Sequence, residues 1–252
     1  MPSLSPLLKI ERRADPPTAL PENATADDKK FQPAMDFDTD GCYNVPAIGA
    51  DGRTAEGLDP GSGDSAGCRD PSDLANSNVY ARQRCNHGWC AYLYDYYFEK
   101  DTAFFGLGGH RHDWEHIAVW VQDGTPKFVS ASQHGAYEIK AAQDVRWDGT
   151  THPKMVYHKD GINTHNFRFA SEADDAVENA SGAWFYGDLV SWNGFPTAAL
   201  RDTLMSTDFG DASIAIKDGS YAGHLDEARG ENAPEFDSSL DDGSPGVPGF
   251  DA

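Results

Sequence analysis

The chain has 252 residues and a formal net charge of −21, with 41 acidic residues against 20 basic ones. This length fits one domain with tails, and the charge argues against a nucleic-acid-binding protein and against adsorption to anionic lipid by charge alone. No apolar run approaches the length of a transmembrane helix, so we expect no helical span.

The N-terminal stretch over residues 1–35 is rich in proline and mixed in charge, which indicates a disordered leader. It has no apolar segment after Met1, so no signal peptide is visible. Arg12 and Arg13 precede Ala14 as in a dibasic propeptide cleavage site.

The next segment is acidic, with Asp36, Asp38 and Asp40 alternating before Gly41. The spacing matches the first half of a calcium loop, but Ala47 stands at the twelfth position, where an EF-hand needs glutamate. The segment is therefore not an EF-hand, and its residues alone indicate an acidic turn.

The 4 cysteines all lie early in the chain, at Cys42, Cys68, Cys85 and Cys90. An even number among turn-forming residues suggests two disulfides rather than catalytic thiols. The spacing leaves three pairings open. A zinc site built from all the thiolates is the alternative, and the missing C-x₂-C pairs disfavour it.

The pattern of the remaining chain is β-rich. A helix is compatible with residues 72–81, behind a cap at Ser72, and helices are also expected after Ser171 and over 197–206. Strands are expected at 89–98, 117–122, 127–132, 155–158, 166–170, 183–190 and 213–216. Many short strands with a few helices predict an antiparallel β-sandwich flanked by helices over residues 36–225. Residues 226–252 are acidic and poor in aliphatics, which predicts a disordered tail.

One stretch concentrates the ionisable side chains, from Gly109 to His116. If the apolar run after it is a strand, the period of two places Arg111, Asp113 and Glu115 on one face and His112, Trp114 and His116 on the other. A glycine-rich connection lets the chain turn and bring Asp101 beside His110, which need not follow the alternation.

This arrangement predicts an oxygen-rich cluster with one imidazole. Carboxylates this close raise each other's pKa unless a cation neutralises them. Mg²⁺, Ca²⁺ or Mn²⁺ suits such ligands, and zinc is the runner-up. The alternative is a buried ion-pair network with Arg111 as the counter-ion.

The segment Gly109-His110-Arg111-His112-Asp113-Trp114-Glu115 resembles the signature heptapeptide of the necrosis- and ethylene-inducing protein-like (NLP) family of cytolysins. Further blocks resemble the family in the same order, over roughly residues 36–221: 97–101, 156–161, 164–169, 189–192 and 208–212.

The resemblance implies a β-sandwich shared with sea-anemone pore-forming toxins and certain fungal lectins. It implies that Asp101, His110, Asp113 and Glu115 hold the divalent ion, with His165 nearby. Its four-cysteine type implies the pairs Cys42 with Cys68 and Cys85 with Cys90, and a second calcium site at Asp36, Asp38 and Asp40. Four further residues are candidates for contact with the ion's ligands or with a bound molecule: Arg111, His112, His134 and His165.

The function that the resemblance implies is a secreted, metal-dependent cytolysin, monomeric in solution and not an enzyme. Its partner would be the sugar headgroup of glycosylinositol phosphorylceramide sphingolipids in the outer leaflet of the plant plasma membrane. Two alternatives stay open: a metal-dependent hydrolase with Glu115 or Asp113 as general base, and a non-lytic sugar-binding or immunogenic relative.

Overall fold

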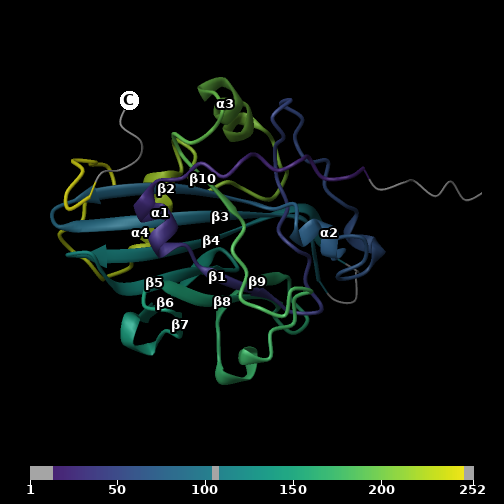
Figure 1. The fold of residues 1–252 in the computed structure, drawn as a ribbon, viewed down its shortest axis with the longest axis horizontal. Coiled ribbons are helices and arrows are strands. Elements are labelled where there is room, and N and C mark those ends of the chain that lie inside the picture. The colour runs from purple at the N-terminus through teal and green to yellow at the C-terminus, as the bar shows by residue number, and fades with distance from the viewer. Residues whose placement is uncertain (1–13, 104–107, 247–252) are drawn as a thin grey trace, which may run out of the picture.

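The computed structural model describes residues 14–103 and 108–246, which form two β-sheets and several short helices (Figure 1). The large sheet has the strand order β10-β2-β3-β4-β5-β6. Its strands are β2 (Asn78–Asn86), β3 (Trp89–Thr102), β4 (Gly109–Gln122), β5 (Thr125–Gln133), β6 (Ala136–Ala141) and β10 (Asp188–Ser191). The small sheet joins β1 (Ala34–Phe37), β8 (His152–Lys159), β7 (Trp147–Asp148) and β9 (His165–Phe169). Neighbours pair antiparallel except β1 with β8 and β10 with β2, which run parallel.

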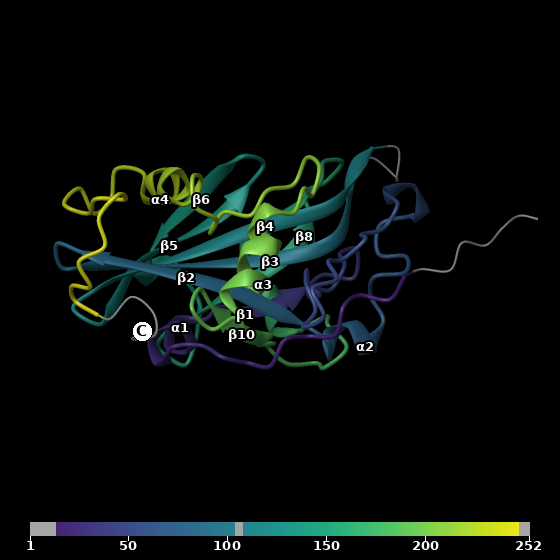
Figure 2. The same cartoon turned by 90° about the horizontal axis from the view of Figure 1, so that it is seen from above.

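The helices lie around the large sheet. They are α1 (Ala26–Phe31), α2 (Pro71–Leu74), α3 (Ala198–Ser206) and α4 (Tyr221–Arg229), with 3-10 turns η1 (Pro60–Ser62), η3 (Ala142–Asp144) and η4 (Glu172–Asp175). Figures 1 and 2 both place α2 and α4 at opposite ends of this sheet. Within the described ranges, no helix is long and apolar enough to cross a membrane.

The core lies on both faces of the large sheet. On one face, Phe98 of β3 stacks on Tyr157 of β8 with ring centroids 3.7 Å apart, which holds the two sheets together. On the other face, Trp120 of β4 packs with buried residues of α3 and α4. Alternate residues of a strand point to opposite faces, so one strand supplies both cores. The prediction of a β-sandwich flanked by helices is confirmed.

Three predicted elements differ from the structure. The strand expected over 183–190 begins only at Asp188. The helix expected over 72–81 ends at Leu74, and Asn78 already begins β2. Val79 and Tyr80 are β-branched and aromatic, and pairing with both β3 and β10 outweighs a weak helical pattern. The stretch 213–216, expected as a strand, contributes buried isoleucines from an irregular segment.

The described parts of both chain ends are folded. This finding corrects the prediction of a disordered leader and a disordered tail. Thr25 caps α1 by accepting a hydrogen bond from the Asp28 amide at 3.0 Å, and β1 pairs with β8. Beyond residue 225, Phe236 is only 3% exposed and packs edge-on against Trp120 at 5.0 Å. A few aromatic anchors order a segment whose overall composition is polar. The predictions for residues 1–13 and 247–252 lie outside the described residues.

Both predicted disulfides are present, between Cys42 and Cys68 and between Cys85 and Cys90. The second joins opposed residues of the β2–β3 hairpin. Cross-links of this kind limit the unfolded chain and so stabilise the fold.

Candidate functional site

The site is built on the hairpin of β3 and β4. The two strands pair so that Asp101 lies opposite His110. Gly109 precedes His110 with a φ of +92°, and a Cβ there would lie 2.2 Å from the Asp101 carbonyl oxygen. Only glycine fits this approach, so Gly109 brings the ends of the two strands together.

Three predicted ligands meet at this point. Asp101, His110 and Asp113 each offer an atom, and these atoms lie within 4.8 Å of one another. We call these three residues the acidic cluster. Nδ1 of His110 lies 2.6 Å from the His112 carbonyl oxygen, which can only accept, so Nδ1 carries the proton. The lone pair of Nε2 is therefore free to bind a metal ion.

The electrostatics of the cluster fit a cation. Burial and the charge of Asp101 raise the pKa of Asp113 well above its usual range. Burial and the charge of Asp113 do the same for Glu115. Oxygen ligands with one imidazole suit a hard divalent ion, whose charge would relieve the repulsion.

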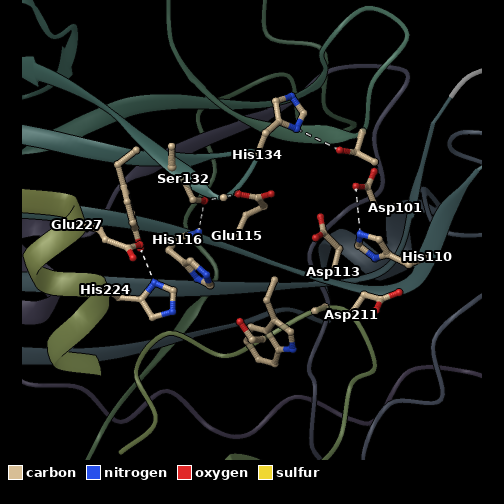
Figure 3. A pocket seen from close by; sticks show the side chains of 17 residues that line it. Asp101, His110, Asp113, Glu115, His116, Ser132, His134, Asp211, His224 and Glu227 are labelled. Atoms are coloured by element: carbon tan, nitrogen blue, oxygen red, sulfur yellow. Dashed lines mark hydrogen bonds and ion pairs between the residues drawn. The ribbon is translucent and has the colours of Figure 1, made fainter. Parts of the chain in front are cut away.

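Glu115, the fourth predicted ligand, lies in the same pocket but outside the acidic cluster (Figure 3). Its carboxylate accepts a hydrogen bond from the Ser132 hydroxyl, which in turn accepts one from the His116 amide at 2.7 Å. The pocket is a cavity of about 240 Å³ with a largely polar lining. Glu115 is thus placed to face a bound molecule or a metal-bound water.

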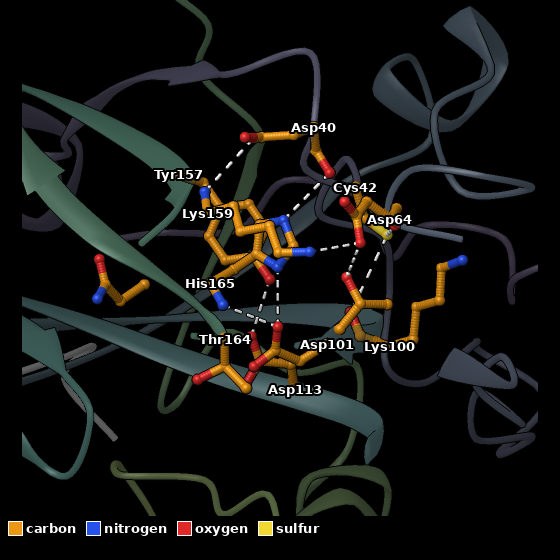
Figure 4. A network of polar contacts seen from close by, with 12 residues as sticks. Asp40, Cys42, Asp64, Lys100, Asp101, Asp113, Tyr157, Lys159, Thr164 and His165 are labelled. Atoms are coloured by element: carbon orange, nitrogen blue, oxygen red, sulfur yellow. Dashed lines mark hydrogen bonds and ion pairs between the residues drawn. The ribbon is translucent and has the colours of Figure 1, made fainter. Parts of the chain in front are cut away.

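His165 lies behind the cluster and orients Asp101 (Figure 4). Its backbone amide and its Nδ1 each lie 2.8 Å from Oδ1 of Asp101, and its Nε2 lies 3.1 Å from the Asp40 carbonyl oxygen. Burial opposes the charged ring, but the hydrogen bonds to Asp101 and Asp40 outweigh it and raise the pKa of His165. Oδ1 of Asp101 is thus occupied, and Oδ2 lies on the side of His110.

Two histidines predicted near the site have different surroundings. His134 lies at the pocket, where its ring contacts Asp160 at 3.1 Å and Asn166 at 2.9 Å. His112 points to the opposite face, as predicted, with Nδ1 2.6 Å from the Tyr97 hydroxyl. Burial lowers the pKa of His112 to about 4, so its ring is neutral.

Arg111 does not take the counter-ion role that was predicted for it. Its guanidinium donates to the carbonyl oxygens of Glu56 and Gly57, at 3.0 Å each. Because the loop around Gly57 uses these donors, Arg111 fastens that loop to β4 rather than serving as the counter-ion of the carboxylates.

The acidic segment at Asp36, Asp38 and Asp40 does not form a common site in the described structure. Asp36 accepts hydrogen bonds from the amides of Glu178 and Asn179, and Asp38 pairs with Arg168 at 3.1 Å. Among the described residues, only the acidic cluster gathers three such ligand atoms. Protein donors thus satisfy the carboxylates of Asp36 and Asp38, and the second calcium site stays a prediction of the family resemblance.

Several residues in and behind the pocket escaped the sequence analysis. Asp95 does not line the pocket, but it lies 2.6 Å from Nδ1 of His116, which does, and only the β3–β4 register reveals this pair. Ser132, His224 and Glu227 come from β5 and α4, and no local pattern marks them.

Comparisons with known proteins agree with this fold. The sequence model of the family described as "Necrosis inducing protein (NPP1)" matches residues 25–228. NLP effector protein 10 of Phytophthora capsici is 34% identical over 217 residues, which span 84% of this chain and 85% of that protein. The solved structure titled "NLPPya in complex with mannosamine" is 31% identical with a TM-score of 0.72, over 86% of this chain and 98% of that one. A structure titled "Crystal structure of non-toxic HaNLP3 protein" is 27% identical with a TM-score of 0.71, over 85% and 97% of the two chains.

The chain has the β-sandwich fold of the solved NLP toxin structures, and its pocket is acidic. The chain belongs to the necrosis-inducing protein (NPP1) family, whose model covers most of its length.

Proposed function

We propose that this protein is a secreted cytolysin that needs a divalent ion, Mg²⁺ or Ca²⁺, and binds a sugar headgroup at its pocket. The observation that carries the proposal is the acidic cluster of Asp101, His110 and Asp113 at the wall of a cavity of about 240 Å³. A hard ion that keeps water-filled positions can exchange those waters for sugar hydroxyls. The relative solved with mannosamine supports a sugar as the ligand.

The proposed receptor is the glycosylinositol phosphorylceramide of the plant plasma membrane, as the family resemblance implies. Two disulfides support an oxidising, extracellular compartment. A net charge of −21 disfavours attraction to an anionic surface, so binding would have to recognise the headgroup itself.

Dye release from vesicles that contain this sphingolipid tests the proposal. We expect leakage with calcium or magnesium, none with EDTA, and at least a tenfold loss for Asp113→Ala, which removes a buried ligand. Asp123→Asn is the matched control, because it removes one charge at an exposed turn between β4 and β5. Equal leakage from folded Asp113→Ala and wild-type protein would overturn the metal-dependent cytolysin.

The non-toxic relative favours a second candidate, sugar binding without lysis. This reading predicts metal-dependent binding to the same vesicles, seen by co-sedimentation, with no dye release. A hydrolase reading predicts turnover of a glycoside or ester, and that Glu115→Gln keeps the metal but loses the rate.

A further inference from the structure

The sequence contains two acceptor motifs for N-linked glycosylation, at Asn23-Ala24-Thr25 and at Asn179-Ala180-Ser181. A glycan is bulky and hydrophilic, so a folded protein can carry it only on an asparagine whose amide reaches the surface. Two disulfides support an oxidising compartment, as in the secretory pathway where this modification takes place. The surroundings of the two asparagines differ in the structure.

Asn179 is buried, and the fold uses both hydrogens of its side-chain amide. It is 4% exposed, and its Nδ2 donates to Oδ1 of Asp36 at 3.0 Å and to the Ala183 carbonyl oxygen at 2.9 Å. An asparagine amide has two hydrogens, and N-glycosylation replaces one of them with a sugar carbon. A glycan on Asn179 would therefore break one of these buried hydrogen bonds. The hydroxyl of Ser181 donates to Oδ1 of Asn179 at 2.6 Å, so this motif serves the fold itself.

Asn23 is exposed, and the described structure uses only one hydrogen of its side-chain amide. Its Nδ2 donates to the Gly194 carbonyl oxygen at 2.9 Å, which leaves the second hydrogen for a sugar. The backbone amide of Asn23 donates to the Leu189 carbonyl oxygen at 2.9 Å, and its carbonyl oxygen accepts from the Ser191 amide at 3.1 Å. A glycan on Asn23 breaks none of these contacts.

Asn23 lies at the edge of the large sheet. β10 pairs with β2 on one side, and Asn23 forms a single bridge with Val190 of β10. The pocket of the acidic cluster has no lining residue from β2 or β10, so a glycan at this edge leaves the pocket open. An exposed sheet edge can pair with another chain, and a bulky hydrophilic group beside it hinders such pairing.

We propose that Asn23 carries an N-linked glycan and that Asn179 does not, an inference that rests on the secreted location in the proposed function. In the reaction, the Asn23 amide nitrogen attacks the anomeric carbon of an oligosaccharide that is attached to a lipid diphosphate. The new C–N bond replaces the C–O bond to the diphosphate. The amide loses one proton, and the lipid diphosphate leaves with the bonding electron pair. Because the transfer precedes folding, a chain that is modified at Asn179 cannot form its buried amide contacts and is absent from the folded product.

Secretion of the full chain from a eukaryotic expression host, behind a secretion signal, tests the proposal. We expect the secreted wild-type protein to shift once in gel mobility when peptide-N-glycosidase F removes the glycan. Peptide mass spectrometry should find the deamidation that this enzyme leaves at Asn23. Asn23→Gln should lose the shift entirely, and it retains both an amide donor and the Thr25 cap of α1. Ser181→Ala is the matched control, because it removes the other motif, and it should shift as the wild type does.

Three results would overturn the proposal: no shift in the secreted wild type, a second glycan on the folded protein, or a shift that survives in Asn23→Gln and disappears in Ser181→Ala. Mass spectrometry of the wild type locates the glycan even where a variant is not secreted. Dye release from vesicles separates this inference from the proposed function. Leakage caused by secreted protein that has no glycan would refute the glycan alone, whereas glycosylated protein without leakage would refute the cytolysin alone.

Discussion

At the scale of single residues, the hydrogen bonds behind the acidic cluster should determine its affinity for a metal ion. His165 holds one oxygen of Asp101 through two contacts of 2.8 Å, which turns the other oxygen toward His110. Loss of such an outer partner commonly costs about 10–100-fold in metal affinity. We therefore expect His165→Gln to weaken calcium or magnesium binding by about that factor in calorimetry. His152→Gln is the control, because that ring bonds to the Gln32 carbonyl oxygen on the small sheet and should leave affinity unchanged. Equal affinities of the two variants would contradict this role.

The raised pKa of Asp28 predicts how the stability of the protein depends on pH. Its pKa rises from 3.8 to about 6 in the folded protein. A raised carboxyl pKa means that the folded state holds the proton more tightly, so its contribution to stability is full at low pH and is lost as pH rises through the window from about 4 to about 6. A difference of two pKa units corresponds to about 3 kcal/mol at most. The free energy of unfolding of Asp28→Asn, relative to that of wild type, should thus rise by about 1–3 kcal/mol from pH 4 to pH 7, measured by urea unfolding. A pH-independent difference would refute the shifted pKa.

At the scale of elements, the hairpin of β3 and β4 depends on Gly109. A side chain there adopts a left-handed backbone at a cost of about 1–2 kcal/mol, and the close approach to the Asp101 carbonyl oxygen adds to this. We expect Gly109→Ala to destabilise the protein by more than that amount and to abolish metal binding, because Asp101 and His110 separate. Gly124→Ala is the matched control, since it also has a positive φ but meets no atom within 4 Å. It should lower stability modestly in urea unfolding and keep the metal. Metal binding by Gly109→Ala would show that the register tolerates the shift.

The same hairpin explains what the sequence could predict. Strand periodicity from Asp113 to Val121 assigned the two faces correctly, because successive side chains alternate between the faces and a slip of one residue would exchange the two sets. The glycine-rich connection between the two strands, and not the alternation, predicted Asp101 beside His110, which the register confirms. The local pattern failed at β2, where Val79 pairs with β10 and Tyr80 pairs with both β10 and β3. Nor does a local pattern reveal the partners of Asp36 and Asp38, because Glu178, Asn179 and Arg168 lie far along the chain. Contacts between distant segments leave no local pattern, so Ser132 and α4 of the pocket were missed for the same reason.

At the scale of the whole molecule, the C-terminal segment should be part of the cooperative fold. Phe236 packs against Trp120 in the core beneath α4, although the family match ends at residue 228. Truncating a buried phenylalanine typically costs about 3–5 kcal/mol. We expect Phe236→Ala to lower the free energy of unfolding by about that amount, with coincident transitions in far- and near-ultraviolet circular dichroism. Leu240→Ala, at an exposed position nearby, should change it little. A small effect of Phe236→Ala would mean that this segment is not part of the cooperative unit.

The last prediction concerns the effect of the net charge on the rate of dye release, and it rests on the proposed function. With a net charge of −21, the protein is repelled by an anionic surface, and this repulsion extends over the Debye length. That length falls from about 30 Å at 0.01 M salt to about 8 Å at 0.15 M. Adding phosphatidylserine to vesicles that carry the sphingolipid should therefore slow dye release several-fold at low salt. Sodium chloride at a fixed calcium concentration should restore the rate, because it screens the repulsion without removing the ion from the acidic cluster. Vesicles with a neutral lipid in place of phosphatidylserine provide the control and should leak at a rate that depends little on salt. Faster release from the anionic vesicles at low salt would instead mean that bound calcium bridges the protein to the lipid phosphates and that headgroup recognition is not the main attraction.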